Sequence, residues 1–304
     1  MFPRDFHVAF DRMAILRVIP AISEELIPER TLSVVSLNTA KATNSDEMLH
    51  ALHSAPRLRQ ADLFLLQEVA DEDGKTNAAE DMARGLGYFA AFAAAAPGVH
   101  DQGLAIVSRY PIHDVQIRGL KRYDLGSRTR SRFALAATVC TPWRGLRLWN
   151  AHLDTRINAA ERLEQLECVI DEAARHAGPQ LIGGDFNTND VYWYRNRLPL
   201  PGGPAHSALI RRAMKQHGFE TPLPDALNTF PALRRHLDWI FVRGLRPLAA
   251  SVEPAAFSDH NAIWIRLSLE QSSESDGHHA PGSADEFHSE AAAAKRSPLL
   301  ELSP

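Results

Sequence analysis

Short apolar runs alternate with polar turns along most of the chain, and each run is about the length of one strand. Val, Leu and Ile dominate these runs, as is typical of strands that are at least half buried. The pattern predicts strands over residues 32–37, 62–66, 88–94, 103–108, 133–140, 146–153, 181–182, 237–242 and 261–267. The last two runs are apolar on both faces, so we expect them at interior positions of a sheet.

Apolar residues at helical spacing separate several of these runs. Asn158 and Glu161 form a capping box before a 3.6-residue apolar repeat, which predicts a helix over 158–176. A helix is expected from Ser45, with Met48, Leu49 and Leu52 on its inner face. Further helices are predicted over 77–87 and 207–216. The chain is therefore expected to contain both strands and helices.

The two ends of the chain lack this alternation. Residues 1–30 carry three prolines, and we expect an N-terminal extension that packs beside the first strand. From about residue 269 the composition changes to Ser, Gly, Glu, His and Ala without apolar periodicity, which is typical of a disordered tail. The expected organisation is therefore an extension (1–30), one folded domain (31–268) and a tail (269–304).

The segment 181–189, LIGGDFNTN, changes abruptly from strand residues to polar residues. Asp185 and Asn187 are two positions apart, and in an extended segment they would point the same way. Gly183 and Gly184 remove side chains just before them, which we interpret as clearance for a substrate phosphate. A polar turn chosen for its backbone geometry is the alternative.

Polar side chains recur at or next to the ends of the other apolar runs. They are Asn38, Glu68, His152, Asp154, Asp185, Asn187, Asp238, Asp259 and His260. Taken singly, each has a plain structural explanation, such as a solvated strand end, a core histidine or a turn. Asp238 is the exception, because an unpaired carboxylate inside the apolar run LDWIFV would be costly and needs a partner.

Together these residue types suit a hydrolytic metal site. Mg²⁺ prefers oxygen ligands, which Glu68 and Asp259 can supply. Asp185 is the candidate base for an attacking water. Asn187, His152 and a protonated His260 are candidate donors to a phosphoryl oxygen, with Asp238 as the carboxylate that holds His260.

Two further groups are candidates for substrate binding. If the segment RTRSR is extended, Arg128, Arg130 and Arg132 share one face and can grip phosphates; a solvated strand entry is the alternative. Trp193, between two tyrosines, can stack on a base or rest on a lipid headgroup, or can simply pack in its loop.

Composition narrows the class of protein. The chain has 304 residues and a formal net charge of −4, which argues against a protein that coats nucleic acid. Two cysteines are too few for a disulfide framework or a zinc cluster and indicate a reducing compartment. Neither a signal-peptide core nor a run long enough to cross a membrane is present, so the expectation is a cytoplasmic protein without stable membrane insertion.

The ordered set of motifs resembles the endonuclease/exonuclease/phosphatase superfamily over about residues 31–268. It comprises Asn38 after a strand, LLQEV (65–69), GLAIVSRYPI (103–112), WNAHLDT (149–155), GGDFNT (183–188), LDWIFV (237–242) and SDH (258–260). The resemblance implies a four-layer α/β/β/α sandwich of two mixed sheets flanked by helices. It also implies a Mg²⁺- or Mn²⁺-dependent phosphoesterase site.

The same resemblance suggests a role for each residue of the motifs. Glu68 is the principal metal ligand, Asn38 orients the base or the water at the metal, and Asp259 is a metal-side carboxylate. Asp185 is the base, and Asn187 contacts the phosphate. His260 binds the phosphate and is oriented by Asp238.

Three departures bear on the branch of the superfamily. Ala40 stands where the enzymes that repair abasic sites carry an acid, His152 stands where they carry a tyrosine, and His236 replaces an arginine common in relatives. An abasic-site endonuclease is therefore disfavoured. We expect hydrolysis of a phosphodiester, with nucleic acid or a nucleotide favoured, by metal-assisted in-line attack of water. The alternatives are a sphingomyelin- or phospholipid-type phosphodiesterase, an inositol-phosphate phosphatase, and a non-catalytic relative that only binds a partner.

Overall fold

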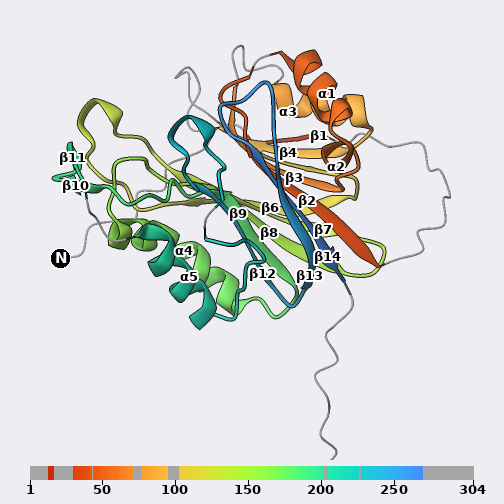
Figure 1. The fold of residues 1–304 in the computed structure, drawn as a ribbon. Helices are drawn as coiled ribbons and strands as arrows, with labels where there is room; N and C mark the ends of the chain where they lie inside the picture. Colours follow the sequence, from red (N-terminus) through yellow and green to blue (C-terminus); the bar gives the residue numbers. More distant parts are fainter. Residues whose placement is uncertain are drawn as a thin grey trace, which may run out of the picture. The chain divides into compact units, whose positions relative to one another are not determined.

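Two mixed β-sheets lie face to face in the described part of the chain (Figure 1). The computed structural model describes residues 13–16, 30–42, 44–70, 77–94, 103–201, 205–225 and 227–269. In spatial order the first sheet has β1 (Met13–Leu16), β4 (Phe89–Ala93), β5 (Gly103–Ser108), β3 (Leu63–Val69), β2 (Thr31–Asn38), β14 (Ala262–Ser268) and β13 (Arg246–Glu253). Only β2 and β3 pair in parallel in this sheet; its other neighbours are antiparallel.

The second sheet has five strands and one parallel pair, β8 with β9. Its spatial order is β12 (Asp238–Arg243), β9 (Gln180–Asp185), β8 (Gly145–His152), β7 (Phe133–Cys140) and β6 (Ile112–Gly119). A separate hairpin pairs β10 (Tyr192–Tyr194) with β11 (Leu198–Leu200). The parallel pairs matter for function, because the carboxyl ends of parallel neighbours lie at the same edge of a sheet.

Helices cover the outer face of each sheet (Figure 1). The first sheet is covered by α1 (Ser45–Ser54), α2 (Pro56–Arg59) and α3 (Ala78–Leu86), and the second by α4 (Ala159–Arg175) and α5 (His206–Gln216). Short 3₁₀ turns lie at Gly126–Arg128 and Pro231–Leu233. The layers are helix, sheet, sheet, helix, so the predicted four-layer α/β/β/α sandwich is confirmed.

Period-2 alternation in the strands explains the two cores. In β2, Leu32 and Val34 face the second sheet, whereas Val35 and Leu37 face the helices. The buried helix residues follow the predicted periodicity, since α1 buries Met48 and Leu52 and α4 buries a stripe through Leu166 and Val169. The predicted capping interaction of α4 is present, with the Glu161 carboxylate accepting from the Asn158 backbone N–H at 2.6 Å.

Some elements differ from expectation. Strands β6 and β13 were not predicted, because most of their side chains are exposed or only half-buried and their sequences carry no apolar run. The interior position predicted for residues 237–242 is wrong: β12 is an edge strand, buried on both faces and partly covered along its free edge by a bridge between Glu220 and Val242. The expectation for 261–267 is confirmed, since β14 lies between β2 and β13.

The N-terminal extension is only partly described. Met13–Leu16 pairs with β4 at the edge of the first sheet, not beside β2 as predicted. The predicted tail from residue 269 falls outside the described residues, apart from Leu269 itself. None of the helices in the described part has both the length and the apolar character needed to cross a membrane.

Candidate active site

Strand ends from both sheets meet at one end of the sandwich. Asn38 ends β2, His152 ends β8 and Asp185 ends β9, while Asp238 begins β12. In the second sheet, Asp185 is the register partner of both His152 and Asp238. Pairing of strands distant in sequence therefore places these side chains next to one another, and contacts between β2 and β9 bring Asn38 to them from the facing sheet.

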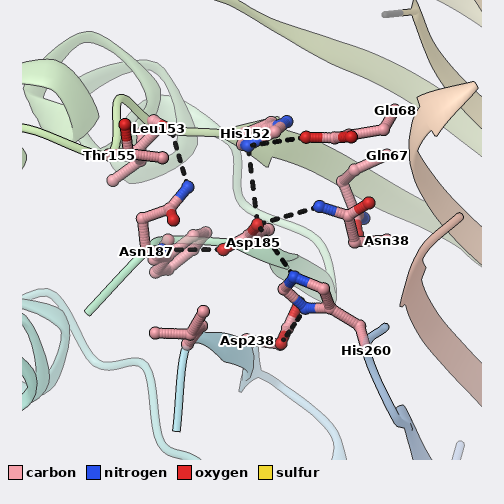
Figure 2. A network of polar contacts seen from close by, with 12 residues as sticks. Asn38, Gln67, Glu68, His152, Leu153, Thr155, Asp185, Asn187, Asp238 and His260 are labelled. Carbon is pink, nitrogen blue, oxygen red and sulfur yellow. Dashed lines mark hydrogen bonds and ion pairs between the residues drawn. The ribbon is translucent and has the colours of Figure 1, made fainter. Parts of the chain in front are cut away.

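Asp185 lies at the centre of the cluster and is 1% exposed (Figure 2). Its Oδ2 accepts a hydrogen bond from Asn38 Nδ2 at 3.0 Å, and its Oδ1 accepts from the Asn187 backbone N–H at 2.8 Å. The Nε2 atoms of His152 and His260 lie 3.5 and 3.9 Å from Oδ2. Burial, followed by the charge of Asp238, raises the pKa of Asp185 to about 6.

His260 and Asp238 form a buried pair. His260 Nδ1 lies 2.9 Å from Asp238 Oδ2, and the Phe230 ring packs against the imidazole with centroids 5.0 Å apart. Burial by itself lowers the pKa of His260, but the hydrogen bond and charge of Asp238 outweigh it and raise that pKa to about 9. His260 is therefore a cation at neutral pH, with Nε2–H directed toward Asp185.

Glu68 reaches the cluster from a β-bulge in β3. The register with β5 shifts between Leu66 and Val69, and Glu68 adopts a left-handed conformation with φ of 53°. Its carboxylate is 21% exposed and lies 4.0 Å from His152 Nε2. Burial and the nearby Asp185 raise the pKa of Glu68, and the charges of Lys41 and Arg132 together with a hydrogen bond from Asn38 partly offset this rise.

His152 is neutral in this environment. Burial, followed by the positive charges of Arg132 and His260, lowers its pKa well below the usual value. It can therefore donate one hydrogen bond to an oxygen of a ligand without carrying a charge.

The donor set fits a divalent cation on the Glu68 side of the cluster. After burial, repulsion from a neighbouring carboxylate raises the pKa of both Glu68 and Asp185, and a cation would relieve this repulsion. Carboxylate and amide oxygens are also hard donors. Asp185, Asp238 and His260 also offer atoms within 4.8 Å of one another. That second group suits a metal less well, because a protonated His260 cannot ligate and its Nδ1 is engaged by Asp238.

The interpretation of the two glycines as clearance for a phosphate is wrong. Gly184 has a φ of 136°, and a Cβ there would lie 1.9 Å from the Ala151 carbonyl oxygen. A Cβ on Gly183 would lie 2.9 Å from the Leu65 side chain. The glycines allow close approach of β8 and of the facing sheet, and thereby bring Asp185 to the strand ends.

The extended face predicted for Arg128, Arg130 and Arg132 is absent. Arg128 lies in a 3₁₀ turn and is exposed, whereas Arg132 is largely buried and donates from Nε to Asp154 Oδ1 at 3.1 Å. Arg132 alone of the three is close enough to lower the pKa values of Glu68 and His152. Arg130 is exposed and donates to the backbone carbonyls of its own loop.

Two other predicted site residues lie outside the cluster. Asp259 precedes His260 but its side chain is exposed, and its contribution is electrostatic, raising the pKa of His260. Trp193 belongs to β10, where Asn158 binds both its backbone N–H and its carbonyl and Arg156 packs over its ring. The more exposed aromatics of this hairpin are Tyr192 and Tyr194, at 43% and 47%.

Asn187 lies in the cluster with a φ of 52°, and its Nδ2 donates to the Leu153 carbonyl.

Several polar residues that support the site were missed. Gln67 and Asn150 join the sheets through a 2.8 Å hydrogen bond, and Arg162 and Gln165 of α4 bind the segment after β8. A sequence signal for Arg162 existed, since it occupies the buried stripe that continues through Leu166 and Val169. A polar residue at such a position requires internal partners.

Comparison with known proteins agrees with this architecture. A structure described as endonuclease/exonuclease/phosphatase from Beutenbergia cavernae matches with a TM-score of 0.62 and 19% identity, over 79% of this chain and 72% of that one. The human Nocturnin catalytic domain with bound sulfate matches at 0.56 and 17%, over 79% and 95%. The endonuclease domain of TRAS1, a telomere-specific non-LTR retrotransposon, matches at 0.51 and 16%, over 79% and 99%.

These likenesses show the fold. The sequence model of the Endonuclease/Exonuclease/phosphatase family matches residues 35–260, a span that includes every clustered residue described above. The chain therefore belongs to the endonuclease/exonuclease/phosphatase family.

Proposed function

We propose that this protein is a divalent-metal-dependent hydrolase that cleaves a phosphodiester, with nucleic acid or a nucleotide as the favoured substrate. The observation that carries the proposal is the convergence on Asp185 of an amide from Asn38 and two histidine rings of different charge. Hydrolysis of a phosphodiester requires a base for the attacking water and hydrogen-bond donors for the phosphoryl oxygens. This arrangement places both beside each other.

Asp185 acts as the base that takes a proton from the attacking water. Its raised pKa, about 6, still leaves it ionised at neutral pH and makes it a better proton acceptor than an ordinary aspartate. Asn38 Nδ2 and the Asn187 N–H bind one oxygen each and so fix the plane of the carboxylate.

His260 acts as a charged donor to an oxygen of the phosphoryl group. Asp238 holds its ring and its charge, leaving Nε2–H for the ligand. His152 adds a neutral donor, and Asn187 has a second amide hydrogen besides the one bonded to Leu153. Donors placed before the reaction stabilise charge that develops on the phosphoryl oxygens.

Glu68 and Asn38 would hold a Mg²⁺ or Mn²⁺ ion, while the exposed Asp259 contributes only its charge. When bound, the ion supplies Lewis acidity and lowers the pKa of water. Glu68 is suited to this role, because its bulge turns the carboxylate to the end of the sheet and leaves it partly open to solvent.

Nucleic acid is favoured by an arginine beside the cluster and by further arginines on the β10–β11 hairpin. Arg132 lies close to Glu68 and His152, and Arg195 and Arg197 lie in the turn of the β10–β11 hairpin near two exposed tyrosines. Guanidinium groups and aromatic rings bind phosphates and bases respectively. The structural likeness to the TRAS1 endonuclease domain is compatible with such a substrate.

A phospholipid headgroup is the second candidate substrate. One face of the hairpin exposes Tyr192 and Tyr194 together with Leu198 and Leu200, and the two strands pair these residues directly across from one another. An apolar face flanked by arginines is also suited to a membrane surface. A non-catalytic relative would be expected to lack site residues, whereas here the cluster is filled and only the acid at position 40 is missing.

The proposal is tested with bis-p-nitrophenyl phosphate and a substrate panel. Purified protein should hydrolyse the reporter in Mg²⁺ or Mn²⁺ and lose activity in EDTA. Asp185→Asn and Glu68→Gln should each reduce kcat at least 100-fold, because each removes a group that acts on the reacting atoms. Single-stranded DNA, RNA, sphingomyelin vesicles and inositol phosphates then identify the substrate class.

Two isosteric variants serve as matched controls. Asp225→Asn and Glu172→Gln each remove a carboxylate that pairs with a surface arginine outside the cluster, and both should keep parental activity. Activity that survives EDTA would rule out the metal mechanism. Inactivity on every substrate with every metal would favour the binding-only alternative.

A further inference from the structure

Arg162, in the first turn of α4, is a fully buried arginine that binds the backbone of two site loops. It is 0% exposed. Its Nη1 donates to the carbonyls of Asp154 and Phe186, the latter at 2.9 Å, and its Nη2 donates to the Thr155 carbonyl at 3.0 Å. Its Nε donates to His206 Nδ1 at 2.9 Å. The first loop follows His152 and the second follows Asp185.

Placing a cation here is unfavourable in itself. Burial lowers the pKa of Arg162 to about 9, although the carboxylates of Asp185 and Asp154 partly offset this effect. Neutral donors could satisfy the same carbonyls at lower cost. A guanidinium differs in having a rigid fork of donors, which can bind carbonyls from two separate loops in one fixed geometry.

One of these carbonyls belongs to a peptide group that also contacts Asp185. The Phe186 carbonyl and the Asn187 N–H are the two ends of a single planar trans peptide. Arg162 Nη1 binds the oxygen end, and the N–H end donates to Asp185 Oδ1 at 2.8 Å. Orienting the carbonyl therefore orients the N–H, and the cation polarises the same peptide.

This peptide needs external support, because Asn187 adopts a left-handed backbone with φ of 52°. Its side chain supplies one restraint by donating to the Leu153 carbonyl at 3.0 Å. Arg162 supplies a second restraint from the other side of the peptide. Gln165, one turn further along α4, binds the Asp154 backbone N–H and carboxylate and so holds the first loop in place.

We propose that Arg162 is a positioning residue for Asp185, acting through the Phe186–Asn187 peptide that lies between them. The proposal rests on the proposed function, because it assigns Arg162 to the support of the base in that reaction. Loss of the guanidinium should let the peptide rotate and should misplace the carboxylate, which lowers kcat while substrate binding by His260 and His152 is kept.

Arg243 offers a matched control at the other end of α4. It too donates to three backbone carbonyls, those of Ala173, His176 and His217, and it packs on the Phe219 ring. It lies outside the cluster described above. An Arg243 variant also loses an arginine that binds backbone carbonyls, but these carbonyls do not support a proposed catalytic residue. It therefore measures the structural effect alone.

The experiment compares Arg162→Lys and Arg162→Gln with Arg243→Lys and Arg243→Gln. For the Arg162 variants we expect kcat on bis-p-nitrophenyl phosphate to fall at least tenfold with KM within twofold. Backbone amide exchange over 185–189 should become at least tenfold faster. The Arg243 variants should keep kcat within twofold and should speed exchange over 173–178 and 217–219 instead. The Gln variants remove the buried charge and so remain informative if a buried lysine prevents folding.

The outcomes separate this inference from the proposed function. Unchanged exchange over 185–189 in a folded Arg162 variant overturns the positioning role whether or not the protein is active. Equal losses of kcat in the Arg162 and Arg243 variants, in proportion to their losses of thermal stability, also overturn it. An inactive parent with the expected exchange pattern would count against the phosphodiesterase and would leave the mechanical link from Arg162 to Asp185 supported.

Discussion

At the scale of single residues, the site depends on backbone conformations that most residues avoid. Glu68 and Asn187 both have positive φ, and Gly184 lies between close neighbours on the strand that carries Asp185. Non-glycine residues in the left-handed region cost on the order of 1 kcal/mol each, so the surrounding contacts must hold them there. These backbone conformations direct the carboxylates of Glu68 and Asp185 and the amide of Asn187 into the cluster.

Gly184→Ala should destabilise the protein strongly. Its Cβ would lie 1.9 Å from the Ala151 carbonyl oxygen, and its φ of 136° is unfavourable for alanine. We expect the free energy of unfolding to fall by about 3 kcal/mol or more, measured by urea denaturation. Gly119→Ala is the control, because a Cβ there has nothing within 4 Å, and it should change stability by less than about 0.5 kcal/mol. Similar midpoints for the two variants would contradict the close-approach argument.

At the scale of elements, α4 and α5 support the site from behind the second sheet. His206 begins α5, is 0% exposed, and accepts a hydrogen bond at Nδ1 from Arg162 of α4. This contact requires an unprotonated Nδ1. Burial, followed by the charge of Arg162, lowers the pKa of His206 to about 4.

The lowered pKa predicts a loss of stability in acid. The unfolded chain binds a proton on His206 near pH 6.5, whereas the folded chain resists protonation until about pH 4. The contribution is therefore fully present above pH 6.5 and is lost as the pH falls through that window, by up to about 3 kcal/mol. His206→Asn keeps an acceptor for Arg162 but cannot titrate, so its urea midpoint should fall less than the parent's between pH 7 and pH 4.5. Parallel pH profiles would refute this account.

At the scale of the whole molecule, the formal net charge is −4, but the segment between β6 and β7 is positively charged. The chain between β6 and β7 lies at the site end of the second sheet, because the start of β7 pairs with the end of β8, with Ala134 opposite Ala151. That segment carries Lys121, Arg122, Arg128, Arg130 and Arg132 against one acidic residue, Asp124. A polyanionic substrate would therefore meet positive charge near the cluster despite the net charge.

Salt dependence tests this local charge on the full protein. If about three cationic side chains contact the phosphates of a single-stranded oligonucleotide, kcat/KM should fall roughly 20-fold between 50 and 200 mM NaCl. The small reporter bis-p-nitrophenyl phosphate carries one charge and serves as the internal control, with little change expected. Equal salt responses for both substrates would argue against a nucleic acid strand bound along these residues.

The sequence by itself determined the positions of the buried strands and of helices α1, α3, α4 and α5, and the identity of the polar residues that close the apolar runs. Both properties are local, since period-2 or helical spacing and strand-end chemistry can be read within a few residues. For this reason Asn38, Glu68, His152, Asp185, Asp238 and His260 could be selected in advance. Strands β6 and β13 were missed, because most of their side chains are exposed or only half-buried and neither strand has an apolar run.

Tertiary structure decided which of those residues meet and what charge they carry. Asn38 and Asp185 are 147 positions apart and come together only because β2 and β9 face each other across the sandwich. Two histidines of the same site acquire opposite protonation, as His152 is buried beside a cation and His260 is buried beside Asp238. The side chains of Asp259, Arg128 and Trp193 lie outside the cluster for the same reason. The direction and burial of a side chain depend on sheet pairing between distant segments, which local sequence patterns do not encode.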